Sequence, residues 1–149
     1  LALSRQNLPV LDRASLEPAE GLARGAYALT GPADGADIIL VATGSEVALA
    51  LEARTALAGE GIAAGVVSMP SWELFEEQEP GYRERVLPGP VRKLAVEAGS
   101  TLGWRRYVGD EGDVIGWDLF GMSAPGGQAL DKAGFNVRNV VEKAKSLLG

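Results

Sequence analysis

The stretch Asp37–Gly61, DIILVATGSEVALALEARTALAGEG, decides the fold, because it predicts a buried strand, a tight turn and a helix. Its apolar run Ile38–Val41 is short and mostly β-branched, which is typical of a parallel strand covered on both faces. Thr43 and Glu46 have the spacing of a capping box, which predicts a helix N-terminus at the turn. The apolar residues spaced for one buried face of that helix are Val47, Ala50, Leu51, Leu57 and Ala58.

A second strand completes a βαβ unit around this helix. We expect Gly59 and Gly61 to end the helix, and the apolar run Ile62–Ser68 to form the next strand. Further along the chain, strands predicted at Val91–Glu97 and Gly112–Phe120 alternate with helical segments, and Ala26–Leu29 has the character of an edge strand. This alternation indicates an α/β fold, a three-layer, doubly wound, mostly parallel sheet of about five strands.

The helices that follow the second strand also have sequence signals. Ser71 is placed to cap a short acidic helix at Trp72–Gln78, in which Leu74 and Phe75 would face the core and the glutamates would face water. Ser123 is expected to cap the helix that precedes Gly134. The predicted helices are Trp72–Gln78, Pro80–Leu87, Thr101–Val108, a segment from about residue 124 to Ala133, and the amphipathic Val137–Leu148.

Composition excludes several classes of function. The chain has 149 residues, a net charge of -6 and scattered basic residues, so the concentrated basic patch of a nucleic-acid-binding protein is missing. No apolar run approaches the roughly 20 residues needed to span a bilayer, and no signal peptide is present, which favours a cytoplasmic protein. The chain contains no cysteine and no histidine, which excludes thiolate catalysis, disulfides and histidine-based general base chemistry.

The sequence divides into three parts. Residues 1–13 resemble the end of a strand followed by a proline-containing loop, as if they were the tail of a preceding domain. Residues 14–36 are rich in Gly, Pro, Ala and Glu and have the character of a linker, and residues 37–149 carry the α/β pattern. Because residue 1 is Leu, we expect the chain to be either a piece of a longer protein or a processed product.

Four positions are candidates for binding or catalysis, and each has a simpler structural explanation. Gly44-Ser45 could hold a phosphate through backbone N–H groups, although the capping box explains the same turn. Glu76-Glu77 could bind a divalent ion or form a solvated helix face. Glu97, at the end of a predicted strand, is either a functional carboxylate or an anchor for the next turn. Arg5 lies after the apolar Leu1-Ala2-Leu3, where ligands bind in α/β proteins, but its spacing alone favours a solvated loop arginine.

Several blocks of sequence, in order along the chain, resemble the transketolase family. The first, Leu3–Pro9 (LSRQNLP), is similar to the end of its pyrimidine-binding domain. The others are similar to its C-terminal domain: Gly25-Ala26-Tyr27, Ala42–Val47, Val67–Ser71, Ala95–Gly99, Phe120–Pro125 and Gly134–Val141. Each block is weak alone, but together they cover nearly the whole chain. The SRQNLP, VSMPS and FGxSAP blocks favour transketolase over related thiamine enzymes. The glycines Gly126 and Gly127 depart most visibly from the pattern.

The resemblance implies a parent enzyme that transfers two-carbon ketol units between sugar phosphates. It uses thiamine diphosphate and a divalent metal, Mg or Ca, which the family binds between two upstream domains of a homodimer. None of the family's catalytic, cofactor-binding or metal-binding residues falls in this chain, so the isolated chain is expected to be inactive. Arg5 matches the family's arginine for the substrate phosphate, a role that suits a guanidinium.

Two other hypotheses for the domain remain open. In the first, it is a regulatory module whose strand ends and Gly44-Ser45 turn bind a small anionic effector. In the second, it is a purely structural domain that supports assembly, with the terminal helix and Trp72, Trp104 or Trp117 packed at a subunit interface.

Overall fold

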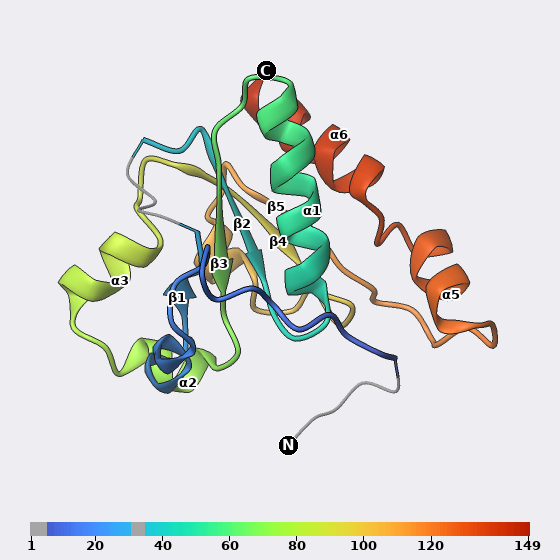
Figure 1. Cartoon of the computed structure of the whole chain (residues 1–149), viewed down its shortest axis with the longest axis horizontal. Helices are drawn as coiled ribbons and strands as arrows, with labels where there is room; N and C mark the ends of the chain where they lie inside the picture. The colour runs from blue at the N-terminus through green and yellow to red at the C-terminus, as the bar shows by residue number, and fades with distance from the viewer. Residues whose placement is uncertain (1–5, 31–34) are drawn as a thin grey trace.

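The computed structural model of the chain describes residues 6–30 and 35–149. At its centre lies a five-stranded sheet in which one edge strand runs antiparallel and the other four strands are parallel. Leu40 on the central strand lies opposite Val66 on one neighbour and Leu94 on the other. The strand order is β1 (Tyr27–Ala28), β3 (Ala64–Ser68), β2 (Ile38–Ala42), β4 (Arg92–Val96) and β5 (Asp113–Ile115) (Figure 1). This confirms the predicted α/β class and the mostly parallel sheet.

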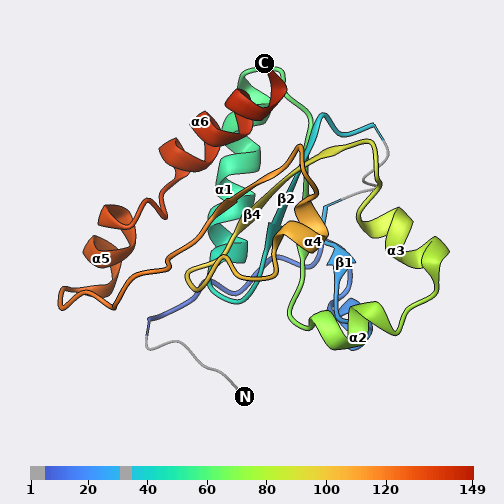
Figure 2. The same ribbon diagram turned by 180° about the vertical axis from the view of Figure 1, so that it is seen from behind.

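Side chains of the strands alternate between two separate cores. The residues of one set, Ile38, Leu40, Ala42, Ala64, Val66, Leu94, Val96 and Ile115, face α1 (Glu46–Gly59) and α6 (Val137–Leu148). The other set, Ile39, Val41, Val67 and Ala95, faces α2 (Trp72–Glu76), α3 (Pro80–Val86) and α4 (Arg105–Val108). Figure 1 shows α1 in front of the sheet with α6 beside it, and Figure 2 shows α4 on the other side of the sheet. All five residues of β2 and of β3 are buried, as expected of strands covered on both faces.

Helix α1 ends at Gly59, as predicted, and Gly61 follows with a left-handed φ of 80°. The expected buried face is partly wrong, because Ala58 is exposed while Ala53 is fully buried. Ala53 lies three residues after Ala50 and four before Leu57, in the middle of the apolar stripe. Ala58 follows Leu57 and is therefore turned about 100° around the helix, away from the sheet.

Part of the segment predicted as a linker belongs to the sheet. The short 3₁₀ helix η1 (Ala19–Arg24) leads into β1, which pairs with the outer side of β3 where an edge strand was predicted. Leu29 is fully buried, and its N–H donates to the Val66 carbonyl at 2.7 Å. The Val66 N–H in turn donates to the Thr30 hydroxyl at 3.0 Å. The limits 1–13, 14–36 and 37–149 stay predictions for the arrangement of domains.

The α2–α4 side of the sheet is built around aromatic rings. Ser71 caps α2 as predicted, since its hydroxyl accepts the Leu74 N–H at 3.3 Å. Phe75 is buried, whereas the prediction for Leu74 is wrong, because this side chain is 41% exposed. Adjacent residues of an α-helix point about 100° apart, so Leu74 and Phe75 cannot both face the core from this short helix. The helix predicted at Thr101–Val108 is shortened to α4, and Trp104, just before it, is almost completely buried.

Strand β5 (Asp113–Ile115) is shorter than the strand predicted at Gly112–Phe120, because the backbone after Ile115 leaves the hydrogen-bond ladder with β4. After Ile115, the Trp117 N–H donates to the Gly99 carbonyl at 2.7 Å instead of extending the ladder. Helix α5 (Gly126–Lys132) follows Pro125 and has no side-chain cap, so the predicted Ser123 cap is wrong. Ser123 lies two residues before Pro125, the residue that occupies the N-cap position.

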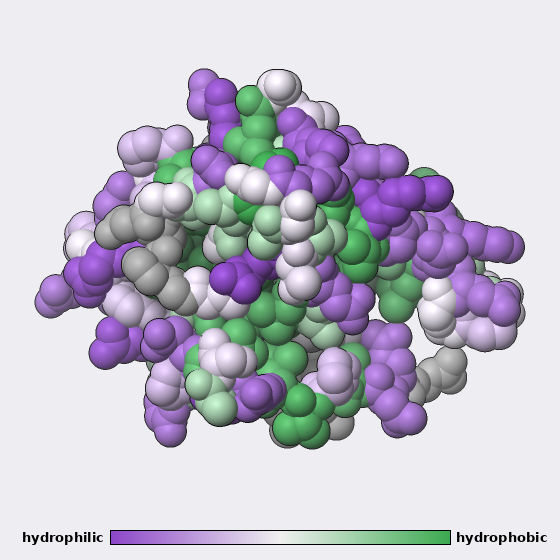
Figure 3. Space-filling model, turned by 45° about the horizontal axis from the view of Figure 1, so that its top comes forward, coloured by the Kyte–Doolittle hydropathy of each residue, from purple (hydrophilic) through white to green (hydrophobic). Residues whose placement is uncertain are grey.

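Helix α6 has the predicted limits and is the clearest amphipathic element. Asn136 caps it, with its side-chain oxygen accepting the Asn139 N–H at 2.9 Å. Val140, Val141 and Ala144 are buried against the sheet and α1. Charged residues cover the outer side, and the part of the surface where α5 and α6 lie is largely hydrophilic in Figure 3.

Candidate functional site

The carboxyl ends of β2 and β4 form the natural binding position of this sheet. From β2 the chain passes through α1 to β3 on one side, and it then crosses to β4 on the other side of β2. In open α/β sheets, ligands bind where the strand order reverses in this way. A crevice of about 320 Å³ lies at this edge. Its walls include Thr43, Ser71, Trp72, Glu73, Glu97 and Ser100.

The turn that leaves β2 differs from the predicted capping box. Gly44 has a φ of 56°, and Ser45, the N-cap residue of α1, already has a helical backbone conformation. A side chain that caps a helix usually comes from an N-cap residue in an extended conformation, and α1 has no side-chain cap. The Thr43 carbonyl accepts the Glu46 N–H at 3.2 Å, and the Ser45 hydroxyl donates to the Glu46 carboxylate at 2.6 Å. The predicted Thr43–Glu46 capping box is therefore wrong, because the Glu46 side chain bonds to Ser45 instead.

Glu97, in the wall of the crevice, feels the negative charge of a second carboxyl group, that of Glu46. Glu46 is 6% exposed at the start of α1, and Glu97 is half-buried directly after β4. Burial raises the pKa of the Glu97 carboxyl, and the negative charge of Glu46 raises this pKa further. Among the described residues that line the crevice, none is Lys or Arg. This negative surface disfavours a phosphate at Gly44-Ser45, so the geometry gives no support to an anionic effector there.

Replacing Glu97 by Gln is expected to stabilise the chain at neutral pH. A raised carboxyl pKa means that the folded state binds the proton more tightly than the unfolded state does. Stability therefore falls as the pH rises from the ordinary value of 4.5 through the raised pKa, and then stays level. The Glu97→Gln variant lacks this loss, so its midpoint of thermal unfolding should exceed that of the wild type at pH 7 and match it below about pH 4.

The matched control for this measurement is Glu77→Gln, at an exposed position of the α2 C-cap. It should shift stability by no more than about 0.5 kcal/mol at either pH. A Glu97→Gln variant that was less stable than the wild type at pH 7 would show that the carboxylate anchors the next turn instead.

Glu76 takes part in an ion-pair cluster. Its Oε2 lies 2.8 Å from Arg83 Nη1 and 2.8 Å from Arg106 Nη2. The expectation that Glu76 faces water is thus wrong in part, since its side chain is only 24% exposed. Burial, together with the nearby Glu76 charge, raises the pKa of Tyr107 to about 12. Within residues 6–30 and 35–149, no group of three or more acidic side chains is arranged to hold a metal ion.

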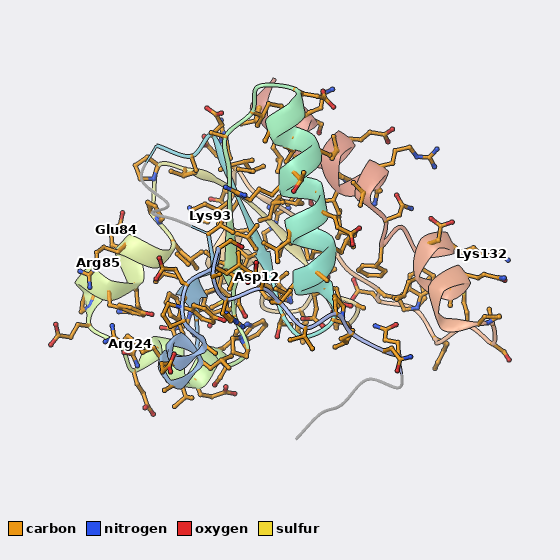
Figure 4. The ribbon with its side chains drawn as sticks, viewed as in Figure 1. Asp12, Arg24, Glu84, Arg85, Lys93 and Lys132 are labelled. Atoms are coloured by element: carbon orange, nitrogen blue, oxygen red, sulfur yellow. The ribbon has the colours of Figure 1, made fainter. Side chains whose placement is uncertain are left out.

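A larger cavity, about 620 Å³, lies outside the edge strand. Arg24 and Arg85, labelled in Figure 4, lie over the ring of Tyr82 at 4.8 and 5.8 Å from its centre. The Tyr82 hydroxyl donates to the Ala26 carbonyl at 2.8 Å, which fixes the ring between η1 and α3. Glu17 and Glu20 also line the cavity and balance the two arginines. These contacts join η1 to α3 at the edge of the fold. Because acidic and basic side chains are mixed here, the cavity does not concentrate charge of one sign.

Sequence reasoning missed two polar residues. Lys93 is 6% exposed, and its Nζ donates to the Val91 carbonyl at 2.8 Å and the Gly89 carbonyl at 3.3 Å (Figure 4). Burial lowers the pKa of its ammonium group. Asp118 accepts hydrogen bonds from the Ser100 and Thr101 hydroxyls at 2.8 and 2.7 Å and from the Thr101 N–H at 2.9 Å. The only signal for either residue was a charged side chain inside a predicted strand.

Arg5, the predicted substrate-binding residue, lies outside the described residues, and its role stays a prediction. No helix in the described part of the chain is both long enough and apolar enough to cross a membrane.

Comparison with known proteins gives one consistent result. The sequence model of the family described as transketolase-like TK C-terminal domain matches residues 25–136. Transketolase from Halalkalibacterium halodurans is 54% identical over 150 residues, an alignment that covers 99% of this chain and 22% of that protein. Transketolase from Geobacillus stearothermophilus is 50% identical over 151 residues, covering 100% of this chain and 23% of the relative.

Solved structures give the same match. A transketolase variant from Pichia stipitis superimposes with a TM-score of 0.87 and 40% identity, over 97% of this chain and 20% of that one. The inactive beta4 tetramer of a split-gene transketolase has a TM-score of 0.70 and 26% identity, over 97% of this chain and 48% of that chain. The chain thus spans about a fifth of the length of the curated relatives named above.

Proposed function

This chain belongs to the transketolase-like TK C-terminal domain family, and from this premise we propose that it is the C-terminal part of a transketolase. The parent enzyme transfers two-carbon ketol units between sugar phosphates. The observation that carries the proposal is the family match over residues 25–136, joined with identities of 54% and 50% to transketolases. The chain itself acts as an accessory domain and does not catalyse the reaction alone.

The chemistry of the described residues supports this division of labour. Thiamine diphosphate with its divalent metal, Mg or Ca, needs cations or backbone donors for its phosphates and oxygen ligands for the metal. The crevice at the strand ends is negatively charged, and no described cluster of acidic side chains suits a metal. These residues do not fit the cofactor, which we assign to the upstream domains of the parent enzyme.

The partners follow from the same proposal. They are the upstream domains of the same polypeptide, sugar phosphates as substrates and a second copy of the parent enzyme in a homodimer, in the cytoplasm. The split-gene transketolase offers a parallel, because its beta4 tetramer is inactive. That parallel supports an accessory role for a chain that spans only part of the enzyme.

Arg5→Ala in the complete enzyme is expected to raise the KM for phosphorylated substrates. Loss of a charge-assisted hydrogen bond costs about 1.5–3 kcal/mol, which corresponds to roughly a 10- to 100-fold change. The effect should fall mainly on KM, because the phosphate is remote from the reacting carbon and is bound alike in the ground and transition states. Steady-state kinetics with a phosphorylated ketose donor measure the change.

The matched comparison uses an unphosphorylated donor on the same Arg5→Ala enzyme, for which KM should change far less. Equal losses with both donors would contradict a phosphate-binding role for Arg5. Ketol transfer by the complete gene product, dependent on added thiamine diphosphate and Mg²⁺, tests the parent activity itself.

A further inference from the structure

Lys93 carries a buried amino group that the proposed function does not use. It is the second residue of β4, it shares a face of the sheet with Ala95, and it is only 6% exposed. In the described part of the chain, no carboxylate forms an ion pair with it. Lysines are almost never buried without such a partner, because burial removes the water that stabilises the ammonium charge. The surroundings of Lys93 therefore favour the neutral amine.

The hydrogen bonds of Lys93 also suit the neutral form. Its Nζ donates to the Val91 carbonyl at 2.8 Å and to the Gly89 carbonyl at 3.3 Å. These two acceptors match the two N–H groups of a neutral amine, whereas an ammonium group has three N–H groups to satisfy. Burial lowers the pKa of the Lys93 ammonium, and the Glu84 carboxylate opposes this with a smaller effect. The neutral nitrogen keeps a lone pair that neither hydrogen bond uses.

Lys93 lines a cavity of about 470 Å³ at the amino end of β4. The crevice described above lies beyond the opposite end of this strand, where Glu97 follows it. A volume of this size falls within the range of about 300–1,000 Å³ that is usual for small-molecule sites. Leu87, Pro90 and Val108 supply apolar wall. The titratable and charged groups around Lys93 are Glu84, Arg92, Arg106, Tyr107, Asp110 and Glu111.

The charges of this cavity favour an uncharged ligand. Arg92 forms an ion pair with Glu111, and Arg106 Nη2 lies 2.8 Å from Glu76 Oε2. Asp110 adds a further negative charge to the wall. Both guanidinium groups are thus already neutralised by carboxylates, so an anionic ligand such as a phosphate ester would meet no excess of positive charge. A neutral ligand avoids the repulsion from the acidic groups.

We propose that Lys93 is a covalent binding site for small neutral aldehydes, which condense with its amino group. The Nζ lone pair forms a bond to the carbonyl carbon, and the carbonyl oxygen becomes a hydroxyl group by taking one proton from the nitrogen. That oxygen then leaves as water with the second proton of the nitrogen, and a C=N double bond remains. Because the imine nitrogen can take up a proton from solvent, it keeps one N–H for the nearer carbonyl, that of Val91.

Reductive trapping of the 149-residue chain with glyceraldehyde tests the site, and its result does not depend on the proposed function. Sodium cyanoborohydride adds hydride to the imine carbon, and peptide mass spectrometry locates the resulting stable secondary amine. Lys132 is the matched control, because it is exposed and has no ion pair in the described part of the chain. At pH 7, Lys93 should react at least about fivefold faster than Lys132, because a larger fraction of its amine is neutral.

Glu84→Gln should make the reaction of Lys93 at pH 7 about twofold faster or more. The change removes the negative charge that favours the ammonium form, so more of the amine is neutral. Glutamine keeps a side-chain oxygen for the Gly89 N–H, which donates to Glu84 Oε1 at 2.9 Å. Glu77→Gln, at an exposed position of α2, is the control and should leave the rate unchanged.

The choice of aldehyde tests the expected ligand class. Glyceraldehyde 3-phosphate should modify Lys93 more slowly than glyceraldehyde does at the same concentration of free aldehyde, because of the acidic groups in the wall. A faster reaction of the phosphate ester would overturn the preference for neutral ligands. Modification of Lys93 no faster than that of Lys132, or an unchanged or lower rate in Glu84→Gln, would overturn the site itself and assign Lys93 to holding the loop before β4.

Discussion

Replacing Trp104 by Ala is expected to lower the free energy of unfolding by about 3–5 kcal/mol, the usual cost of removing a buried large aromatic side chain. Trp104 is 2% exposed and lies in the core on the α2–α4 side of the sheet. Its ring meets Trp72 edge to face at 5.1 Å, and it lies 6.2 Å from the ring of Tyr107. Removing it would leave a cavity between α2, α4 and the sheet, and these rings would lose their partner.

This loss is large compared with the free energy of unfolding of a typical domain, which is roughly 5–15 kcal/mol. Urea unfolding followed by far-UV circular dichroism measures it without relying on the fluorescence of the deleted ring. The matched control is Leu102→Ala, two residues earlier and 83% exposed, which should change stability by about 0.5 kcal/mol or less. A Trp104→Ala variant within about 1 kcal/mol of the wild type would show that the aromatic cluster is not the core of this side.

Gly25→Ala is expected to destabilise the chain by about 3 kcal/mol or more, from backbone strain and steric overlap together. Gly25 has a φ of 80°, which a residue with a Cβ rarely adopts. A Cβ there would lie 2.3 Å from the Phe75 N and 2.4 Å from the Ser71 O, both backbone atoms. The Gly25 carbonyl also accepts the Ser71 N–H at 3.0 Å, so neither segment can shift without breaking the junction between β1 and α2.

Gly61→Ala separates the two causes. Gly61 has the same φ of 80°, but a Cβ there would meet no atom within 4 Å. That variant should cost about 1–2 kcal/mol from strain alone, so the excess for Gly25→Ala measures the overlap. Equal losses in the two variants, measured by chemical denaturation, would contradict the close packing at Gly25.

The regular elements could be predicted from the sequence because local signals determine them. The β-branched run Ile38–Val41 and the apolar spacing of Val137–Leu148 specify a buried strand and an amphipathic helix without reference to distant residues. The failures arise where the outcome depends on backbone conformation or on a distant partner. Gly44 places Ser45 in a helical conformation and removes the capping box. The Trp117 N–H bonds to the distant Gly99 carbonyl, which ends β5 early.

The candidate site was predictable only in part, for a related reason. The position of Glu97 at a strand end was clear from the sequence, but its partner Glu46 depends on β2 and β4 being neighbours. The ion pairs of Glu76 with Arg83 and Arg106 join residues from three helical segments, and nothing in their spacing indicates them. The burial of Lys93 likewise follows from backbone carbonyls that only the folded chain brings together.

We propose above that this chain is an accessory domain whose parent enzyme performs ketol transfer. Transfer by the purified chain, with a ketose phosphate donor, an aldose phosphate acceptor, thiamine diphosphate and Mg²⁺, tests it most directly. We predict no transfer above the rate without protein, alongside clear transfer by the complete gene product under the same conditions. Transfer by the chain alone, at a rate proportional to its concentration, would contradict the account.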